Sequence, residues 1–140
     1  MSHEVFVNME TAKQLKQAGF DWEVRAHYCE KETSALLYDG YPSAKWNSEL
    51  YDGCLSAPTQ AVAHKWIREV KLVSISVIYK GFHVSNNTAR FEWQVLFEKM
   101  IPEVIGFRDV TQLETSIFPN YEAALEAGLQ KCLTLIIEKQ

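Results

Sequence analysis

Hydrophobic and polar positions along this chain follow two different periods, and the clearest helical period lies in SAPTQAVAHKWIREVK, residues 56–71. At 100° per residue the apolar and polar positions of this stretch fall on opposite arcs. The apolar arc holds Val62, Ala63, Trp66, Ile67 and Val70, and the polar arc holds Gln60, His64, Lys65, Arg68, Glu69 and Lys71. We therefore predict an amphipathic helix over 57–71 that buries Trp66, with Ser56 as its N-cap and Pro58 in its first turn.

Two further helices are predicted, one near each end of the chain. The first covers residues 9–19; Asn8 is a good N-cap, and Gly19 suits the left-handed position that ends a helix. The second covers 121–139, with Asn120 as its N-cap. Its apolar stripe consists of Tyr121, Leu125, Gly128, Leu129, Cys132 and Ile136. This stripe is expected to close the core, and its width leaves a homodimer open as an alternative.

Period-two alternation marks the strands. In residues 20–29 it predicts a half-buried strand with Trp22, Val24, Ala26 and Tyr28 on the core face and Glu23, Arg25, His27 and Cys29 on the solvent face. Residues 72–84 and 89–97 alternate in the same way around the turn sequence SNNT, which predicts a hairpin. Shorter or less regular strands are predicted at 4–7, 34–38 and 110–118, with a connection over 98–109. Residues 39–55 are predicted to form a long loop.

These elements follow the order β-α-β-β-α-β-β-β-α, which indicates an α+β fold. We expect an antiparallel sheet of about five strands, with the helices packed mainly on one face. A chain of 140 residues is the size of one domain with its own core, so residues 1–140 are expected to form a single domain.

Composition narrows the function classes. The chain is 47% hydrophobic and 23% charged, as in an ordinary soluble protein, and no apolar run approaches the ~20 residues that span a bilayer. The first residues lack the basic and apolar regions of a secretory signal, so we expect a cytoplasmic location without membrane contact. The cysteines, Cys29, Cys54 and Cys132, are odd in number and widely spaced, which fits reduced thiols that pack as small apolar residues.

The net charge is −4, yet residues 58–100 carry six Lys and Arg against three Asp and Glu. A local basic face of this kind can hold a small anion or an acidic partner surface. Double-stranded RNA is not an expected partner, although residues 57–138 run α-β-β-β-α as in a double-stranded-RNA-binding domain. That family needs a basic N-terminus on its last helix, and Glu122 and Glu126 occupy it here.

Motifs for catalysis and cofactor binding do not occur in the sequence. There is no phosphate loop, no dinucleotide fingerprint, no hydrolase elbow and no zinc-protease motif. The histidines are scattered at positions 3, 27, 64 and 83, and His27 with Cys29 supplies too few ligands for a metal. We expect no cofactor, no metal and no catalytic residue.

Candidate binding residues fall into two sets. The loop over 39–55 carries Tyr41, Trp46 and Tyr51, with Tyr38 just before it; such aromatics either stack a planar ligand or pack the loop against itself. The following helix presents His64, Lys65 and Arg68 on its polar arc, where they either contact an anion or form a solvated helix face. Together the two sets have the composition of a stacking platform beside anion contacts, as nucleotide sites have.

Three segments show a family resemblance: ETAKQLKQAGFDWEVRAHYC, SAPTQAVAHKWIREVK and PNYEAALEAGLQKCLTLI. Together they cover roughly half the chain, and they resemble small uncharacterised proteins encoded by phages, prophages and mobile elements of gut bacteria. No activity is assigned to that group, so the resemblance implies a fold relationship and a host-cell cytoplasmic location, with no catalytic residue to transfer.

Three functional hypotheses follow from this combination. The first is a non-catalytic, phage-type accessory protein that binds a host or phage protein through exposed aromatics and the basic helix face. The second is a counter-defence sponge that holds a small signalling nucleotide between Tyr41, Trp46 or Tyr51 and the cations Lys65 and Arg68. The third, which we rank last, is a weak hydrolase or nuclease that uses Asp39, Asp52 and His64.

Overall fold

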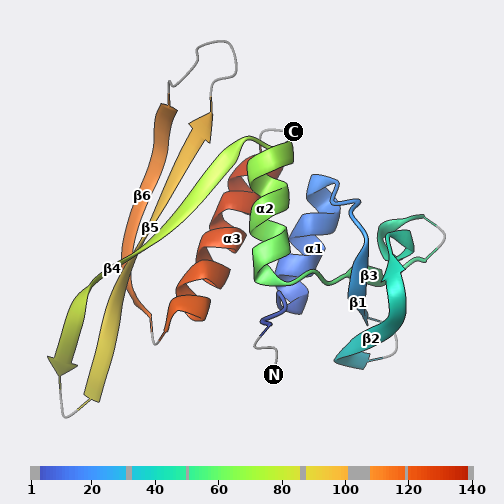
Figure 1. Cartoon of the computed structure of the whole chain (residues 1–140), viewed down its shortest axis with the longest axis horizontal. Coiled ribbons are helices and arrows are strands. Elements are labelled where there is room, and N and C mark those ends of the chain that lie inside the picture. The colour runs from blue at the N-terminus through green and yellow to red at the C-terminus, as the bar shows by residue number, and fades with distance from the viewer. Residues whose placement is uncertain are drawn as a thin grey trace.

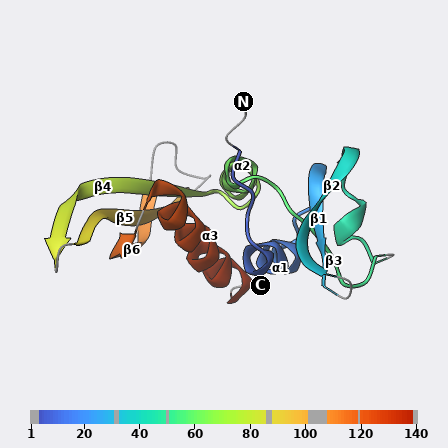
Figure 2. The same cartoon turned by 90° about the horizontal axis from the view of Figure 1, so that it is seen from below.

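The computed structural model describes residues 4–30, 33–49, 51–85, 88–100, 108–118 and 120–138, with the backbone alone at 33–34, 78–85, 88–100 and 108–117. Within these residues the fold is α+β, with helices between two antiparallel sheets (Figures 1 and 2). A small sheet lies at one end of the molecule, a larger sheet lies at the other, and the helices lie between them.

The small sheet contains β1 (Val24–Cys29), β2 (Thr33–Ser43) and β3 (Cys54–Ser56) in the order β2-β1-β3. Its pairing is irregular: between the pairs Val24–Ser43 and Ala26–Tyr38, β2 has four residues where β1 has one. Such an insertion bends the strand and turns side chains out of their regular alternation. A short 3-10 helix, η1 (Lys45–Asn47), follows β2.

The large sheet contains β4 (Val73–Ser85), β5 (Thr88–Met100) and β6 (Arg108–Phe118), in that order. The β4–β5 hairpin predicted from the alternation around SNNT is confirmed, and so is a strand at the position predicted for 110–118. Both ladders are long, and each contains a single register shift.

The helices are α1 (Met9–Ala18), α2 (Gln60–Val70) and α3 (Tyr121–Glu138). The predicted caps of α1 are confirmed: Asn8 Oδ1 accepts from the Thr11 N–H at 2.9 Å, and Gly19 has φ 98°. The predicted cap of α3 is confirmed as well, because Asn120 Oδ1 accepts from the Ala123 N–H at 2.8 Å. Each side-chain oxygen satisfies a backbone donor that has no partner inside its helix.

Polar side chains join α1 to α3, although the two helices are more than a hundred residues apart in sequence. Thr11, which is fully buried, donates its hydroxyl to Glu126 at 2.8 Å, and Gln130 Nε2 donates to Thr11 Oγ1 and Asn8 Oδ1. One turn further on, Gln14 donates to Thr134 at 2.8 Å.

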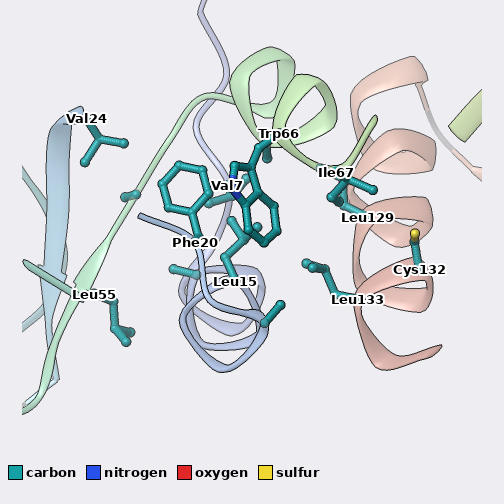
Figure 3. Close-up of a cluster of buried hydrophobic side chains, with 14 of the residues drawn as sticks. Val7, Leu15, Phe20, Val24, Leu55, Trp66, Ile67, Leu129, Cys132 and Leu133 are labelled. Carbon is teal, nitrogen blue, oxygen red and sulfur yellow. The ribbon is translucent and has the colours of Figure 1, made fainter. Parts of the chain in front are cut away.

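The core lies between the three helices and continues under the small sheet (Figure 3). Trp66 of α2 is 1% exposed, as predicted, and packs edge-on against Phe20, with ring centroids 5.3 Å apart. In Figure 3, Ile67 points towards Leu129 of α3. Burial of these side chains is the main favourable contribution to folding.

Two of the predictions about sheet architecture differ from the structure. The sheet of about five strands is replaced by two three-stranded sheets within the described residues, because α2 carries the chain from β3 at one end to β4 at the other. Alternation identifies strands but does not say which strands pair. The strand predicted at 4–7 is reduced to an isolated bridge between Phe6 and Thr59.

The start of α2 also differs from the prediction. Ser56 belongs to β3, and the N-cap is Thr59, whose Oγ1 accepts from the Val62 N–H at 3.2 Å. The reason is local, because a residue that precedes proline is disfavoured in the α region, so Ala57 before Pro58 keeps the chain extended. With this later start, Gln60 is 5% exposed and donates its amide to α3.

The prediction of a loop over 39–55 is wrong in part. β2 continues to Ser43, and Cys54 already begins β3, so the irregular segment is shorter and contains η1. Part of the predicted 98–109 connection, residues 101–107, lies outside the described residues. In the described part of the chain, no helix combines the length and the apolar character needed to cross a membrane.

Candidate functional site

Histidine, cysteine and aspartate side chains lie on the outer face of the small sheet, which is the face turned away from the helices. Along β1, Val24, Ala26 and Tyr28 face the helices, as predicted. His27 and Cys29, which the alternation assigned to solvent, are only 7% and 8% exposed. Their burial corrects that prediction, because η1 places Trp46 on His27, and Cys54 of β3 lies against Cys29.

His27 lies between an aromatic ring and a carboxylate. Its ring stacks on Trp46 with the centroids 3.6 Å apart and an interplanar angle of 11°. Its Nδ1 lies 2.9 Å from Asp39 Oδ1, in a geometry that does not align the two atoms for a hydrogen bond. Asp39 reaches His27 because Tyr38 pairs with Ala26, so the next residue of β2 lies on the same face of the sheet as His27.

Trp46 is held on several sides. Its Nε1 donates to Asp39 Oδ2 at 2.8 Å, Tyr51 packs edge-on with ring centroids 5.2 Å apart, and the Lys45 ammonium lies 4.5 Å from the ring centroid. An indole with one face on His27 and a cation at its ring is occupied by the protein itself. The geometry matches the alternative in which the loop packs against itself.

Tyr38 and Tyr41 behave differently from Trp46. They are 71% and 74% exposed, the highest values among the exposed large hydrophobic side chains of the described residues. Both belong to β2, which is an edge strand of the small sheet. Tyr38 has Phe6 edge-on at 5.5 Å between ring centroids, and the neighbouring Val5 is 39% exposed.

The basic residues of α2 lie elsewhere. Lys65 and Arg68 are exposed, and the Lys71 ammonium lies 5.5 Å from the Trp66 ring centroid. His64 is half-buried, and burial lowers its pKa below 6.5; the nearby Arg68 lowers it further, while a hydrogen bond with the backbone of Ile75 opposes this. His64 therefore lies at the junction of α2 with β4.

The six predicted site residues thus form two groups. Trp46 and Tyr51 lie together, with Tyr41 on the adjacent strand, whereas His64, Lys65 and Arg68 lie on α2, which both views show apart from β2 and η1 (Figures 1 and 2). The structure does not bring the aromatics and the cations into one site, and the nucleotide sponge stays a prediction. The same separation applies to Asp39 and His64, two of the three residues of the hydrolase hypothesis.

Ser56 gives the outer face the residue types of a serine hydrolase. It pairs with His27 across the β1–β3 ladder, and its buried Oγ has no hydrogen-bond partner. A nucleophile must touch its substrate, however, and Ser56 is 1% exposed. The Asp39–His27–Ser56 arrangement is therefore structural.

A cleft of about 250 Å³ lies between the end of α1 and the segment 44–48. It is lined by Lys16, Gly19, Phe20, Asp21, Ala44, Asn47 and Ser48. Its volume is below that of most ligand pockets, and the Asn47 side chain already bonds the backbones of Phe20 and Ser56. Across the described part of the chain, no cluster of three or more His, Cys, Asp or Glu side chains could hold a metal ion.

Three features of this face were not predicted from the sequence: the contact of Asp39 with His27, the hydrogen bond from Trp46 to Asp39, and the pairing of Cys29 with Cys54. Each depends on cross-strand register or on a strand irregularity. The alternation of residues 20–29 does place His27 and Cys29 on one face, which was the available signal. Comparison of the chain with protein-family models, curated proteins and solved structures gives no match.

Proposed function

We propose that this protein acts by binding another protein, through a surface made of Val5, Tyr38 and Tyr41. The observation that carries the proposal is the exposure of Tyr38 and Tyr41 on one edge strand. Trp46, another large aromatic of this region, is engaged by the protein itself.

Two physical arguments support a protein as the ligand. Exposed tyrosines supply a large amphipathic contact area with few rotatable bonds, and tyrosine is enriched among the residues that dominate interface energies. An edge strand also offers backbone groups to which an extended segment of a partner can pair. Gly40 and Pro42 interrupt β2, so such pairing is favoured on the part of β2 that precedes them.

The net charge of residues 1–57, which contain the small sheet, indicates the chemistry of the partner. Residues 1–57 carry nine Asp and Glu against five Lys and Arg. Several acidic side chains near the small sheet, among them Glu4, Glu23 and Asp52, are exposed. A partner surface with basic and apolar side chains would complement this region. With the resemblance to phage and mobile-element proteins, the partner we propose is a host or phage protein.

Site-specific photocrosslinking tests the proposal. A photoreactive phenylalanine analogue at position 41 should capture one partner in bacterial cells, and the same analogue at position 121 should not. Tyr121 is a suitable control because it is also exposed, at 44%, and lies on α3. The purified partner should then bind Tyr38→Ser/Tyr41→Ser at least about tenfold more weakly than wild type, which corresponds to about 1.4 kcal/mol.

Two results would contradict this assignment. One is equal crosslinking at positions 41 and 121, and the other is an unchanged affinity for the partner in the double tyrosine variant. Native mass spectrometry after incubation with a nucleotide extract gives the competing result: a discrete bound mass that Arg68→Ala removes would favour the sponge.

A further inference from the structure

Cys29 and Cys54 face each other directly across the β1–β3 ladder. The Glu30 N–H donates to the Gly53 carbonyl at 2.9 Å, and the Ala57 N–H donates to the Ala26 carbonyl at 3.0 Å. Hydrogen-bonded and non-hydrogen-bonded pairs alternate along an antiparallel ladder, so Cys29 and Cys54 form a non-hydrogen-bonded pair. In such pairs the side chains approach most closely, and here the two Sγ atoms lie 2.6 Å apart without being joined in a disulfide.

The register satisfies the backbone requirement for a disulfide. A non-hydrogen-bonded pair has its Cα atoms about 4.5 Å apart, within the range of about 4.4–6.8 Å that disulfides span. Oxidation would therefore require little backbone movement. The two thiols also differ in access: Cys29 is 8% exposed, whereas Cys54 is half-buried.

The third cysteine provides an internal contrast. Cys132 is 2% exposed on α3, within the apolar core, and burial raises its pKa to about 12. A thiol that is buried among apolar side chains forms little thiolate and reacts slowly.

We propose that Cys29 and Cys54 form a thiol–disulfide exchange site whose substrate is a low-molecular-weight disulfide of the glutathione class. The Cys54 thiolate attacks one sulfur of oxidised glutathione, the glutathione S–S bond breaks, and one glutathione leaves as a thiolate that takes up a proton. The Cys29 thiolate then attacks Cys54 Sγ in the mixed disulfide and releases the second glutathione. The protein loses two protons and two electrons in total, and the glutathione disulfide is reduced to two thiols.

The bond would fasten β1 to β3 and enclose residues 30–53. That segment contains β2, with Tyr38 and Tyr41, and the stretch that covers His27. Because a cross-link restricts the unfolded chain, the oxidised protein should unfold at a temperature about 5–10 °C higher than the reduced protein. The site is independent of the proposed partner binding, since neither sulfur belongs to the proposed binding surface.

The experiment equilibrates the full-length protein in buffers of varied reduced-to-oxidised glutathione ratio, quenches with an alkylating agent and maps the peptides by mass spectrometry. We expect one internal disulfide that links Cys29 to Cys54 and reverses in excess reduced glutathione, with Cys132 alkylated only after denaturation. Cys29 and Cys54 both remaining as thiols at every ratio, or a bond from either one to Cys132, would overturn the proposal. This measurement needs no variant, so it does not depend on a substitution that impairs folding.

Serine variants test the assigned order of attack. Cys29→Ser should accumulate a stable glutathione adduct on Cys54, because the thiol that would displace it is absent. Cys54→Ser should leave Cys29 largely unmodified and lack the rise in melting temperature. The opposite pattern, with the adduct on Cys29 and none on Cys54, would overturn the assignment of Cys54 as the attacking thiol.

Discussion

The two sheets of this protein are built in contrasting ways. In the large sheet, the β4–β5 and β5–β6 ladders run over long registers with one shift each. In the small sheet, the short β1–β2 ladder contains two shifts, and Asp39, at the start of the longer insertion in β2, contacts His27 and Trp46. One sheet is defined by its backbone ladder, and the other relies on side chains that cover its outer face.

This difference bears on where function resides. A regular ladder repeats the same backbone interactions and leaves little freedom in side-chain placement, whereas a strand irregularity redirects individual side chains. The exposed tyrosines, the His27–Asp39 contact and the Cys29–Cys54 pair all belong to the irregular sheet. The small sheet is therefore where we place both proposals.

The largest expected effect comes from Trp66→Ala, because Trp66 packs in the core shared by the helices between the sheets. Removal of its 1%-exposed ring should cost about 3–5 kcal/mol of unfolding free energy in urea denaturation. Val70 lies on the same helix and is 49% exposed. Val70→Ala should therefore change the unfolding free energy by less than about 0.5 kcal/mol. If hydrogen exchange of Trp66→Ala showed one sheet melting while the other kept wild-type protection, the idea of a shared core would fail.

A smaller effect, confined to the small sheet, is expected from Trp46→Ala. The change removes the ring stacked on His27 and the hydrogen bond to Asp39. The unfolding free energy should therefore fall by about 2–3 kcal/mol. Hydrogen exchange should accelerate in β1–β3 and stay unchanged in β4–β5. Trp46→Phe keeps an aromatic ring and should recover part of the loss. A variant with wild-type stability would mean that Trp46 is not needed to hold the sheet and is free for a ligand.

A third comparison uses the two asparagine caps. Asn8→Ala should lower the unfolding free energy by about 1–2 kcal/mol, because Asn8 Oδ1 accepts both from the Thr11 N–H and from Gln130 Nε2. Asn120→Ala removes a capping bond of the same kind without the link between helices, and it should cost about 1 kcal/mol. Thermal denaturation of both variants gives the comparison. Equal losses would show that the Gln130 contact contributes nothing measurable.

The smallest expected effect is a pH dependence of the unfolding free energy, which arises from His64 at the junction of α2 with the large sheet. Burial, followed by the charge of Arg68, lowers the pKa of His64 in the folded state, so the unfolded chain binds the proton more readily. Stability from this residue is present above pH 6.5 and declines as the pH falls towards the folded-state pKa. The unfolding free energy of His64→Gln, measured at pH 8, 6 and 5, should fall less than that of wild type. Parallel curves would exclude His64 as a source of the dependence.

Sequence patterns predicted the regular parts of this fold well. Asn8, Gly19 and Asn120 bounded two helices correctly, and the alternation on either side of SNNT predicted the β4–β5 hairpin. These features depend on neighbours in the chain or on an uninterrupted period. Burial of Trp66 also followed from helical spacing alone.

The candidate site was predicted less well, because it depends on register. Asp39 lies in a YDG sequence, which is typical of a turn, and its place beside His27 follows from the register of β1 with β2. Cys29 and Cys54 meet because β1 and β3 pair, which no local pattern encodes. The exposure of Tyr38 and Tyr41 likewise depends on β2 being an edge strand.

Glu126 accepts hydrogen bonds from Asn8 and Thr11, Gln130 donates to the same two residues, and these contacts have a consequence for synthesis of the chain. α1 is translated before α3, yet the side chains that cover its N-terminal turn belong to α3, which is synthesised more than a hundred residues later. Contacts between such distant segments form late, because closing a long loop costs conformational entropy. α1 therefore completes its packing only after α3 has been synthesised, and until then the hydroxyl of Thr11, which is buried in the folded protein, stays open to water.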